Sequence, residues 1–219
     1  MTAFAKRDLN RVRRIPQRAH YDRETIYSIV DAAPICHVAF IQEGRPYVIP
    51  TIHARLEDSL VLHGAPASRL LKQVATGEEL CVAMTLLDGL VLARSVFHHS
   101  MNYRSAVLFG HGHMVEDEER KMRALEALTE HVMPGRWRDA RTPTTAELEA
   151  TTVVEIAIDT ASAKVRTGGP SDDDEDYALP IWAGIIPIRQ QALEPKGDTM
   201  LAKEIEVPQY ILDYVNSGD

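Results

Sequence analysis

The sequence is short of cysteine, of aromatic residues and of long apolar runs, and each shortage excludes a class of protein. It has two cysteines in 219 residues, Cys36 and Cys81. They form neither a CxxC pair nor a Cys/His ligand set, so neither a structural zinc site nor a disulfide scaffold is indicated. Both lie in apolar runs, where a thiol usually packs as a small hydrophobic group. No run reaches the roughly 18–20 apolar residues of a membrane-spanning helix.

The common catalytic signatures are also missing. The chain has no glycine-rich dinucleotide loop, no phosphate-binding P-loop, no nucleophile elbow and no HExxH zinc motif. The first residues lack the apolar core of a secretory signal. We therefore expect a cytoplasmic protein whose chemistry does not depend on one familiar motif.

The charge is acidic overall and unevenly distributed. The formal net charge is −8, which argues against a general nucleic-acid-binding protein. Residues 1–23 carry seven basic side chains against Asp8 and Asp22, a local excess typical of a solvated arm or of a strap over an acidic surface. Residues 172–176 are all acidic and favour a solvated loop, because the glycine and spacing of a calcium-binding EF-hand are absent.

The apolar pattern predicts an α+β protein with a mostly antiparallel sheet, closed as a barrel. Strand signals at 37–41, 46–54, 59–63, 80–87, 105–112 and 151–158 are interrupted by helices at 22–33, 66–77 and 117–132. Pro50 requires a bulge or an edge position, and Asp88-Gly89 predicts a turn. We divide the chain into a basic N-terminal arm (1–23), a main domain (24–190) and a C-terminal extension (191–219).

The strongest local signal for binding is Ser68-Arg69-Leu70-Leu71-Lys72 at a strand-to-helix junction. A hydroxyl, a guanidinium and an ammonium group at the start of a helix favour an anion. A capped amphipathic helix with surface charges explains the same residues.

A second polar segment, residues 100–105, precedes an apolar strand and includes Asn102, Tyr103, Arg104 and Ser105. It is either a loop with a positive rim or a second set of hydrogen-bonding groups for a phosphate. For metals we expect no site, because neighbouring His98 and His99 would point to opposite faces of a strand.

Several segments taken in order resemble the pyridoxamine 5′-phosphate oxidase-like flavin-binding proteins, and within them the nitroimidazole-reductase-like branch. The matching segments are Pro46–Thr51, His63–Leu71, Asn102–Gly110 and Val115–Asp117 followed by a helix. The resemblance implies a homodimeric split β-barrel with FMN at the subunit interface. It places Ile49, Pro50 and Thr51 along the flavin ring, close to His63. Ser68, Arg69 and Lys72 would hold the phosphate, Asn102, Tyr103, Arg104 and Ser105 would complete that side, and Trp182 would cover a flavin face.

The chain also departs from the oxidase pattern. The C-terminal arginine-containing segment that clamps pyridoxamine phosphate is not recognisable, so we do not expect vitamin B6 oxidation. The leading hypothesis is an FMN-dependent oxidoreductase that acts on a small molecule, with no catalytic residue assigned and with His53, His63 and Tyr103 as candidates for proton delivery. Two alternatives stay open: a flavin-binding or flavin-sensing protein without turnover, and a haem-binding split barrel.

Overall fold

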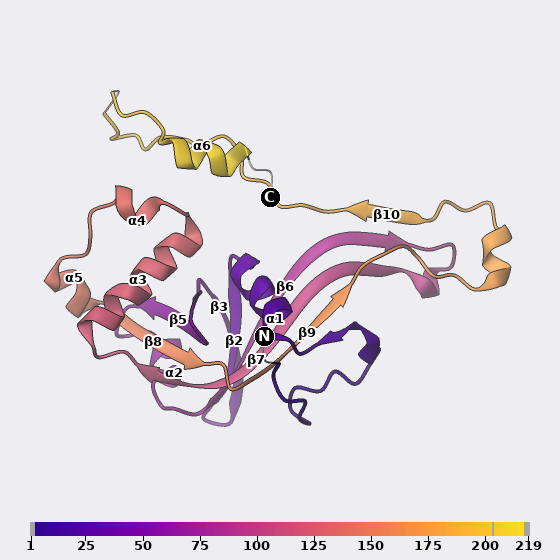
Figure 1. Ribbon diagram of the computed structural model, residues 1–219, viewed down its shortest axis with the longest axis horizontal. Helices are drawn as coiled ribbons and strands as arrows, with labels where there is room; N and C mark the ends of the chain where they lie inside the picture. Colours follow the sequence, from indigo (N-terminus) through magenta and orange to yellow (C-terminus); the bar gives the residue numbers. More distant parts are fainter. Residues whose placement is uncertain (1–2, 203, 217–219) are drawn as a thin grey trace.

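The computed structural model describes residues 3–202 and 204–216, and its centre is one antiparallel sheet (Figure 1). Seven strands follow one another in the order β3-β2-β6-β7-β8-β5-β4, while β9 and β10 pair with β7 and β6, and β1 pairs with β9. The expected α+β class with an antiparallel sheet is confirmed. The strands are β1 (Ala19–His20), β2 (Cys36–Gln42), β3 (Arg45–Thr51), β4 (Ala54–Leu56), β5 (Ser59–Gly64), β6 (Glu79–Leu92), β7 (Ser100–Met114), β8 (Thr152–Ala157), β9 (Thr160–Arg166) and β10 (Gly184–Pro187).

Helices begin at the polar residues that the sequence marks as caps. The side chains of Asp22, Asp117 and Thr144 accept hydrogen bonds from the first turns of α1, α3 and α5, which satisfies backbone N–H groups that have no partner within the helix. The helices are α1 (Arg23–Ala32), α2 (Arg69–Val74), α3 (Glu118–Val132), α4 (Arg136–Asp139), α5 (Thr145–Ala150) and α6 (Gln209–Asn216), with short 3₁₀ turns η1 (Pro16–Arg18), η2 (Val96–His98) and η3 (Asp174–Ala178).

Local backbone chemistry explains two predicted features of the sheet. Glu43 and Gly44 both have positive φ, as a tight hairpin turn between β2 and β3 requires. β3 stands at the end of the strand path, so Pro50 costs no hydrogen bond to a further strand.

The core lies between the inner face of the sheet and α1 and α2. Its fully buried side chains include Ile26, Val38, Leu62 and Leu108. Gly110 allows β7 to pass close to the end of β8, because a Cβ there would lie 1.7 Å from the carbonyl oxygen of Ala157.

The basic N-terminal arm is anchored at two points. Phe4 belongs to the core cluster. The side chain of Asn10 is buried and donates to Thr160 Oγ1 (2.8 Å) and to the carbonyl of Ala161 (2.9 Å) on β9. Residues 1–2 of this arm, and residues 203 and 217–219 of the C-terminal extension, lie outside the described part of the chain.

A long β-ribbon projects from the sheet (Figure 1). We call residues 88–103 and 167–187 the protruding ribbon; it contains the outer part of β6, the start of β7 and β10, with η2 and η3 near its tip. The predicted turn at Asp88-Gly89 is wrong. β6 continues through it with a β-bulge opposite Asn102, because pairing with β7 and β10 overrides the local turn signal. Residues 100–104, expected as a loop, therefore lie in β7.

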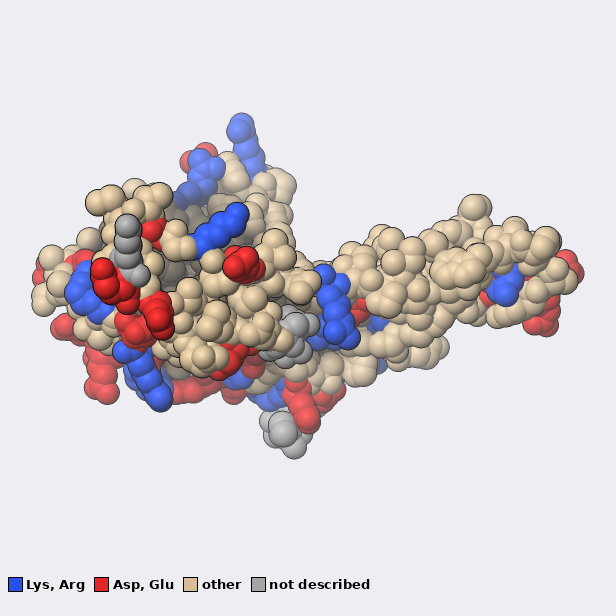
Figure 2. Space-filling model, turned by 90° about the horizontal axis from the view of Figure 1, so that it is seen from above, with Lys and Arg blue, Asp and Glu red and all other residues tan. Residues whose placement is uncertain are grey.

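The surface of this ribbon differs from that of the rest of the chain. In Figure 2 most of its visible surface is uncharged, whereas Lys, Arg, Asp and Glu side chains crowd the opposite end of the molecule. Within the described residues, no helix is both long enough and apolar enough to cross a membrane.

Candidate functional site

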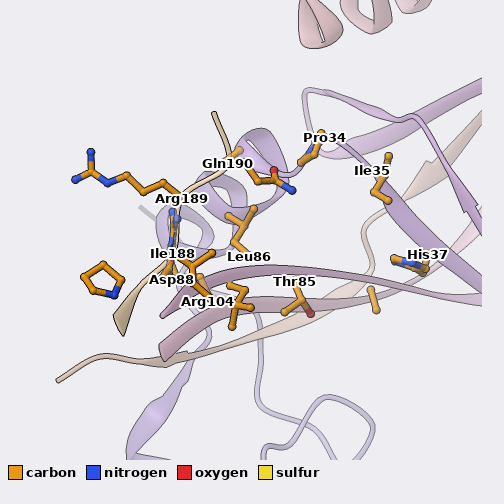
Figure 3. Close-up of a pocket in the computed structure, with 14 residues that line it drawn as sticks. Pro34, Ile35, His37, Thr85, Leu86, Asp88, Arg104, Ile188, Arg189 and Gln190 are labelled. Carbon is orange, nitrogen blue, oxygen red and sulfur yellow. Dashed lines mark hydrogen bonds and ion pairs between the residues drawn. The ribbon is translucent and has the colours of Figure 1, made fainter. Parts of the chain in front are cut away.

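A cleft of about 980 Å³ lies between the outer face of the sheet and the segment that follows β10. This is near the upper end of the roughly 300–1,000 Å³ that small-molecule sites occupy. Figure 3 shows Gln190 and Ile188 on one side of this cleft and His37 and Thr85 on the other, with Arg189 extending away from them. Its walls are largely apolar and include Ala32, Pro34, Ile35, Ala83, Leu86, Leu87 and Pro187.

His37 is the imidazole of this cleft, and strand alternation places it there. Its neighbours Cys36 and Val38 point into the core, so His37 points to the outer face. It makes no hydrogen bond or ion pair with any residue that the structure describes, and it lies opposite Pro50 on β3. The cleft therefore offers a free imidazole next to one of the predicted flavin-binding residues.

His63 lies in a second, smaller pocket of about 230 Å³ against α3. This pocket is mostly apolar, and Ile52, which follows β3, forms part of its wall. Met133 and Arg136 also line it. Burial lowers the pKa of His63 from its usual value, which favours the neutral imidazole. Ile52 follows the end of β3 directly, and Pro50 on β3 pairs with His37 of the large cleft.

The predicted phosphate seat is a pair of exposed cations at the start of α2. The guanidinium of Arg69 lies over the ring of Tyr47, 4.8 Å from its centroid. Neither Arg69 nor Lys72 forms an ion pair with a carboxylate in the described chain. Ser68 Oγ accepts a long hydrogen bond from Leu71 N (3.4 Å), so the hydroxyl caps the helix. Two uncompensated positive charges thus remain available to an anion.

The other half of the predicted phosphate site has partners of its own. Arg104 forms a bidentate ion pair with Asp88, with Nη2 2.8 Å from Oδ1, and both residues line the large cleft. Asn102 is buried and accepts from Arg166 Nη1 at 2.5 Å. Ser105 Oγ donates to the carbonyl of Lys164. These contacts anchor β7 to its neighbours, and the role of Asn102, Tyr103, Arg104 and Ser105 toward a phosphate stays a prediction.

The other residues predicted to contact the flavin ring do not lie together: some are on β3 and one is on the protruding ribbon. Ile49 packs against the core, while Pro50 is exposed on the opposite face of β3. Trp182 is 65% exposed on the ribbon, where its ring lies beside Gly184. The single chain therefore does not bring Trp182 into either cavity.

His53, a candidate for proton delivery, lies in neither cavity. It is fully buried, its Nε2 lies 3.0 Å from the carbonyl of Val30, and its Nδ1 has no partner among the described residues. Burial, with a smaller contribution from the neighbouring His131 ring, lowers its pKa to about 4. A neutral, enclosed imidazole is a structural group, poorly placed to deliver protons to a ligand.

Sequence reasoning missed His37, Asp88, Arg189 and Gln190. The alternation of β2 was a usable signal for His37, because it is polar between two apolar positions. Asp88 was missed because the Asp88-Gly89 pair is typical of a turn. Arg189 and Gln190 meet the sheet only through the chain path after β10, which no local pattern encodes.

The fold and these two cavities define an antiparallel α+β protein with one ligand-sized cleft and a smaller pocket beside its sheet. The chain belongs to the pyridoxamine 5′-phosphate oxidase family, whose model matches residues 22–165. The expected resemblance is confirmed. Among curated proteins none matches the chain.

Three solved structures show how the likeness is distributed. The flavocytochrome Anf3 from Azotobacter vinelandii is 41% identical to this chain, with a TM-score of 0.88. The match covers 95% of this chain and 97% of the Anf3 chain. The FAD and haem binding protein from Mycobacterium smegmatis is 36% identical, with a TM-score of 0.86, covering 90% and 97%. A putative 5-nitroimidazole antibiotic resistance protein from Bacteroides thetaiotaomicron is 26% identical, with a TM-score of 0.56, covering 67% and 86%.

Proposed function

We propose that this protein binds a flavin and a haem and is an oxidoreductase that passes electrons through the flavin. The observation that carries the proposal is the pair of relatives at 41% and 36% identity, both matched over at least nine tenths of this chain. One is named a flavocytochrome and the other an FAD and haem binding protein. The two cavities supply chemistry that suits two cofactors.

The flavin site that we propose is formed around Arg69, Lys72 and His63. FMN carries its 5′-phosphate as a dianion, and FAD carries two negative charges on its pyrophosphate. Two exposed cations with no carboxylate partner among the described residues favour either anion. When bound, the flavin supplies hydride or electron transfer, while the chain binds and orients it. FMN stays the prediction from sequence, and the name of the 36% identical relative makes FAD the competing form.

The haem site that we propose is the large cleft, with His37 as an iron ligand. Neutral imidazole is a common protein ligand of haem iron, and His37 has no competing partner. The cleft is apolar along most of its wall, as a porphyrin requires, and Arg104, Arg189 and Gln190 provide polar groups at its border. Pro187–Gln190 lies beyond the residues that the family model matches, so this cleft is partly built from an addition to the common family fold.

A second copy of the chain is the partner that we propose for the outer face of the sheet. Ile35, Ile41, Val48 and Leu87 on or beside β2, β3 and β6 are 41–62% exposed. Exposed apolar side chains on one face of a sheet are typical of an interaction site, and Ile35 and Leu87 also line the large cleft. Light scattering coupled to size exclusion is expected to give twice the mass of 24.5 kDa, and a monomer at micromolar concentration would contradict the homodimer.

The first experiment is an absorption spectrum of purified protein followed by cofactor extraction. We expect the bands of an oxidised flavin together with a haem Soret band, and chromatography of the extract separates FMN from FAD. A protein that takes up neither flavin nor haemin in titration would overturn the proposal. Oxidation of reduced nicotinamide with quinone or nitro acceptors then separates an enzyme from a non-catalytic flavin-binding protein.

Variants assign each cofactor to its site. Arg69→Ala should weaken flavin binding by about 1.5–3 kcal/mol, the range for a hydrogen bond to a charged group, or roughly 10- to 150-fold in Kd. Arg14→Ala, which removes an exposed arginine of the N-terminal arm, serves as the control. Unchanged affinity in Arg69→Ala would place the phosphate elsewhere.

For the haem, His37→Ala should abolish or shift the Soret band while flavin content is retained. His63→Ala should have the opposite effect, with weaker flavin binding and an unchanged haem spectrum. A Soret band that survives in His37→Ala and is lost in His63→Ala would move the haem to the smaller pocket and contradict our assignment.

A further inference from the structure

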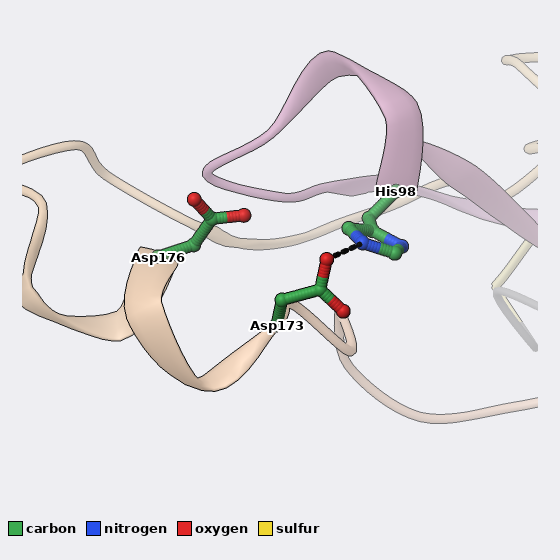
Figure 4. A group of neighbouring side chains, drawn as sticks. All are labelled: His98, Asp173 and Asp176. Carbon is green, nitrogen blue, oxygen red and sulfur yellow. Dashed lines mark hydrogen bonds and ion pairs between the residues drawn. The ribbon is translucent and has the colours of Figure 1, made fainter.

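Two separate segments bring an imidazole and two carboxylates together at the tip of the protruding ribbon. His98 ends η2, while Asp173 precedes η3 and Asp176 lies within it. His98 Nε2 is 3.3 Å from Asp173 Oδ2, and one possible ligand atom from each of the three residues lies within 4.8 Å of the others. Figure 4 shows the His98 ring and the Asp173 carboxylate facing each other across the two segments.

The backbone conformation places the two aspartates on one side of η3. A 3₁₀ turn has three residues per turn, so positions three apart in sequence are stacked. Asp173, which caps η3, and Asp176 within it have this spacing, and both offer a ligand atom beside His98. The acidic run therefore has one specific pair that meets an imidazole 75 residues away in sequence.

The charge around this group is not balanced by the protein. Asp172, the first residue of the acidic run, is paired with Arg94. Asp173, Asp174, Glu175 and Asp176 make no ion pair with a lysine or arginine in the described chain. The side chain of His98 is 23% exposed and its ring packs edge-on against Phe97, whereas the Asp173 carboxylate beside it is 81% exposed. A cation at this position would relieve repulsion between them.

The donor set selects the kind of cation. An imidazole nitrogen suits first-row transition metals, and two carboxylates complete a three-ligand site with room for water. Mg²⁺ and Ca²⁺ prefer oxygen ligands alone. Zn–N and Zn–O bonds of about 2.0–2.2 Å put tetrahedral ligands roughly 3.4 Å apart, so the side chains need to close in by only about an ångström.

We propose that His98, Asp173 and Asp176 bind a divalent transition metal of the Zn²⁺ type, which ties η2 to η3 at the ribbon tip. The site is independent of the flavin and haem sites. Val96 and Phe97, which are 88% and 86% exposed, immediately precede His98. The bound ion would thereby fix the position of the most exposed apolar side chains of the ribbon.

The test is a zinc titration of the full-length, untagged protein carrying its native cofactors. Calorimetry at pH 7.5 should show a site that binds one zinc ion per chain. His98→Ala and Asp173→Asn should each lower this affinity at least about tenfold. The matched controls His99→Ala and Glu175→Gln change a neighbouring imidazole and a neighbouring carboxylate and should leave it unchanged.

A second measurement separates this site from zinc bound at other histidines. Hydrogen exchange should slow on zinc addition in residues 94–99 and 172–178, and His98→Ala should remove that protection while the rest of the exchange pattern is retained. Equal zinc affinity in His98→Ala and wild type, or zinc binding without protection of these two segments, would overturn the proposal.

Discussion

The sheet with its helices and the protruding ribbon are built from the same two strands, β6 and β7, yet they are stabilised differently. Around the sheet, apolar side chains from β2, β6, β7 and β8 meet α1 and α2 in one buried core. Along the ribbon, only Val91 and Ala93 are buried apolar residues within the described range 88–103 and 167–187. Many others are exposed, including Val96, Phe97, Met101, Tyr177, Leu179, Ile181, Trp182, Ile185 and Ile186.

Polar anchors replace the core in the ribbon. Asp172 accepts from Arg94 N, Arg94 Nη1 and Ser95 N, and Arg166 donates to the carbonyls of Gly168 and Gly169 at its base. Because a narrow β-ribbon buries little apolar surface, it is marginally stable by itself. We therefore expect the ribbon to open independently of the sheet. The predictions at Gly110 and Asp172 test this, and the one at His53 concerns the buried interior.

The largest effect is expected in the sheet itself. Gly110→Ala forces the new Cβ against the Ala157 carbonyl, which cannot move without breaking β8, and should cost about 3 kcal/mol of unfolding free energy. Urea denaturation measures it. The matched change Gly169→Ala, at the ribbon base with open space around it, should cost little. Equal losses of unfolding free energy in Gly110→Ala and Gly169→Ala would show that the sheet and the ribbon base are equally constrained.

A pH effect of similar size is expected from His53. Its pKa is about 4 in the folded chain, against 6.5 for a free imidazole. Between these two pKa values, His53 is protonated in the unfolded chain and neutral in the folded chain. The free energy of unfolding therefore falls as the pH drops from 6.5 to about 4, by up to roughly 3 kcal/mol. Below that range both states are protonated and His53 adds no further loss.

Denaturation of His53→Gln across this pH range checks the assignment. The variant should lose most of the wild-type pH dependence, whereas His113→Gln, which changes an exposed imidazole, should keep it. A pH profile in His53→Gln that matches wild type would assign the dependence to other groups.

The smallest change in the global free energy of unfolding is expected at Asp172, where the main effect is on local amide exchange. Asp172→Ala removes the acceptor for two backbone amides and should speed exchange of Arg94 and Ser95 N–H about tenfold, while the global urea midpoint barely moves.

Burial raises the pKa of Asp172, but hydrogen bonds from Ser95 and Arg94 outweigh it, and the net pKa is lowered from 3.8. This anchor is therefore intact above pH 3.8 and is lost as pH falls further.

The control for this change is Asp174→Ala, which removes the exposed neighbouring carboxylate. It should leave exchange at Arg94 and Ser95 unchanged. A large fall in global stability in Asp172→Ala would contradict the independence of the ribbon.

The sequence predicted the elements whose causes are local. The α+β class follows from periodicity and is confirmed. The helix caps Asp22, Asp117 and Thr144 and the hairpin turn at Glu43-Gly44 likewise depend only on neighbouring residues. Asp88-Gly89 was misjudged because its turn chemistry is overridden by strand pairing and by the Arg104 ion pair. The phosphate seat at Arg69 and Lys72 stays a prediction that the geometry leaves available.

By itself the sequence determined the family and the local rules of the fold: which residues alternate, cap and turn, since these depend on contacts within a few positions. Only the tertiary structure decided which distant groups share a site. It placed His37 in a cleft with residues that follow β10, and His98 beside Asp173. It also left apolar side chains of the ribbon uncovered. These outcomes depend on strand register and chain path over 75 residues or more, where no local pattern acts.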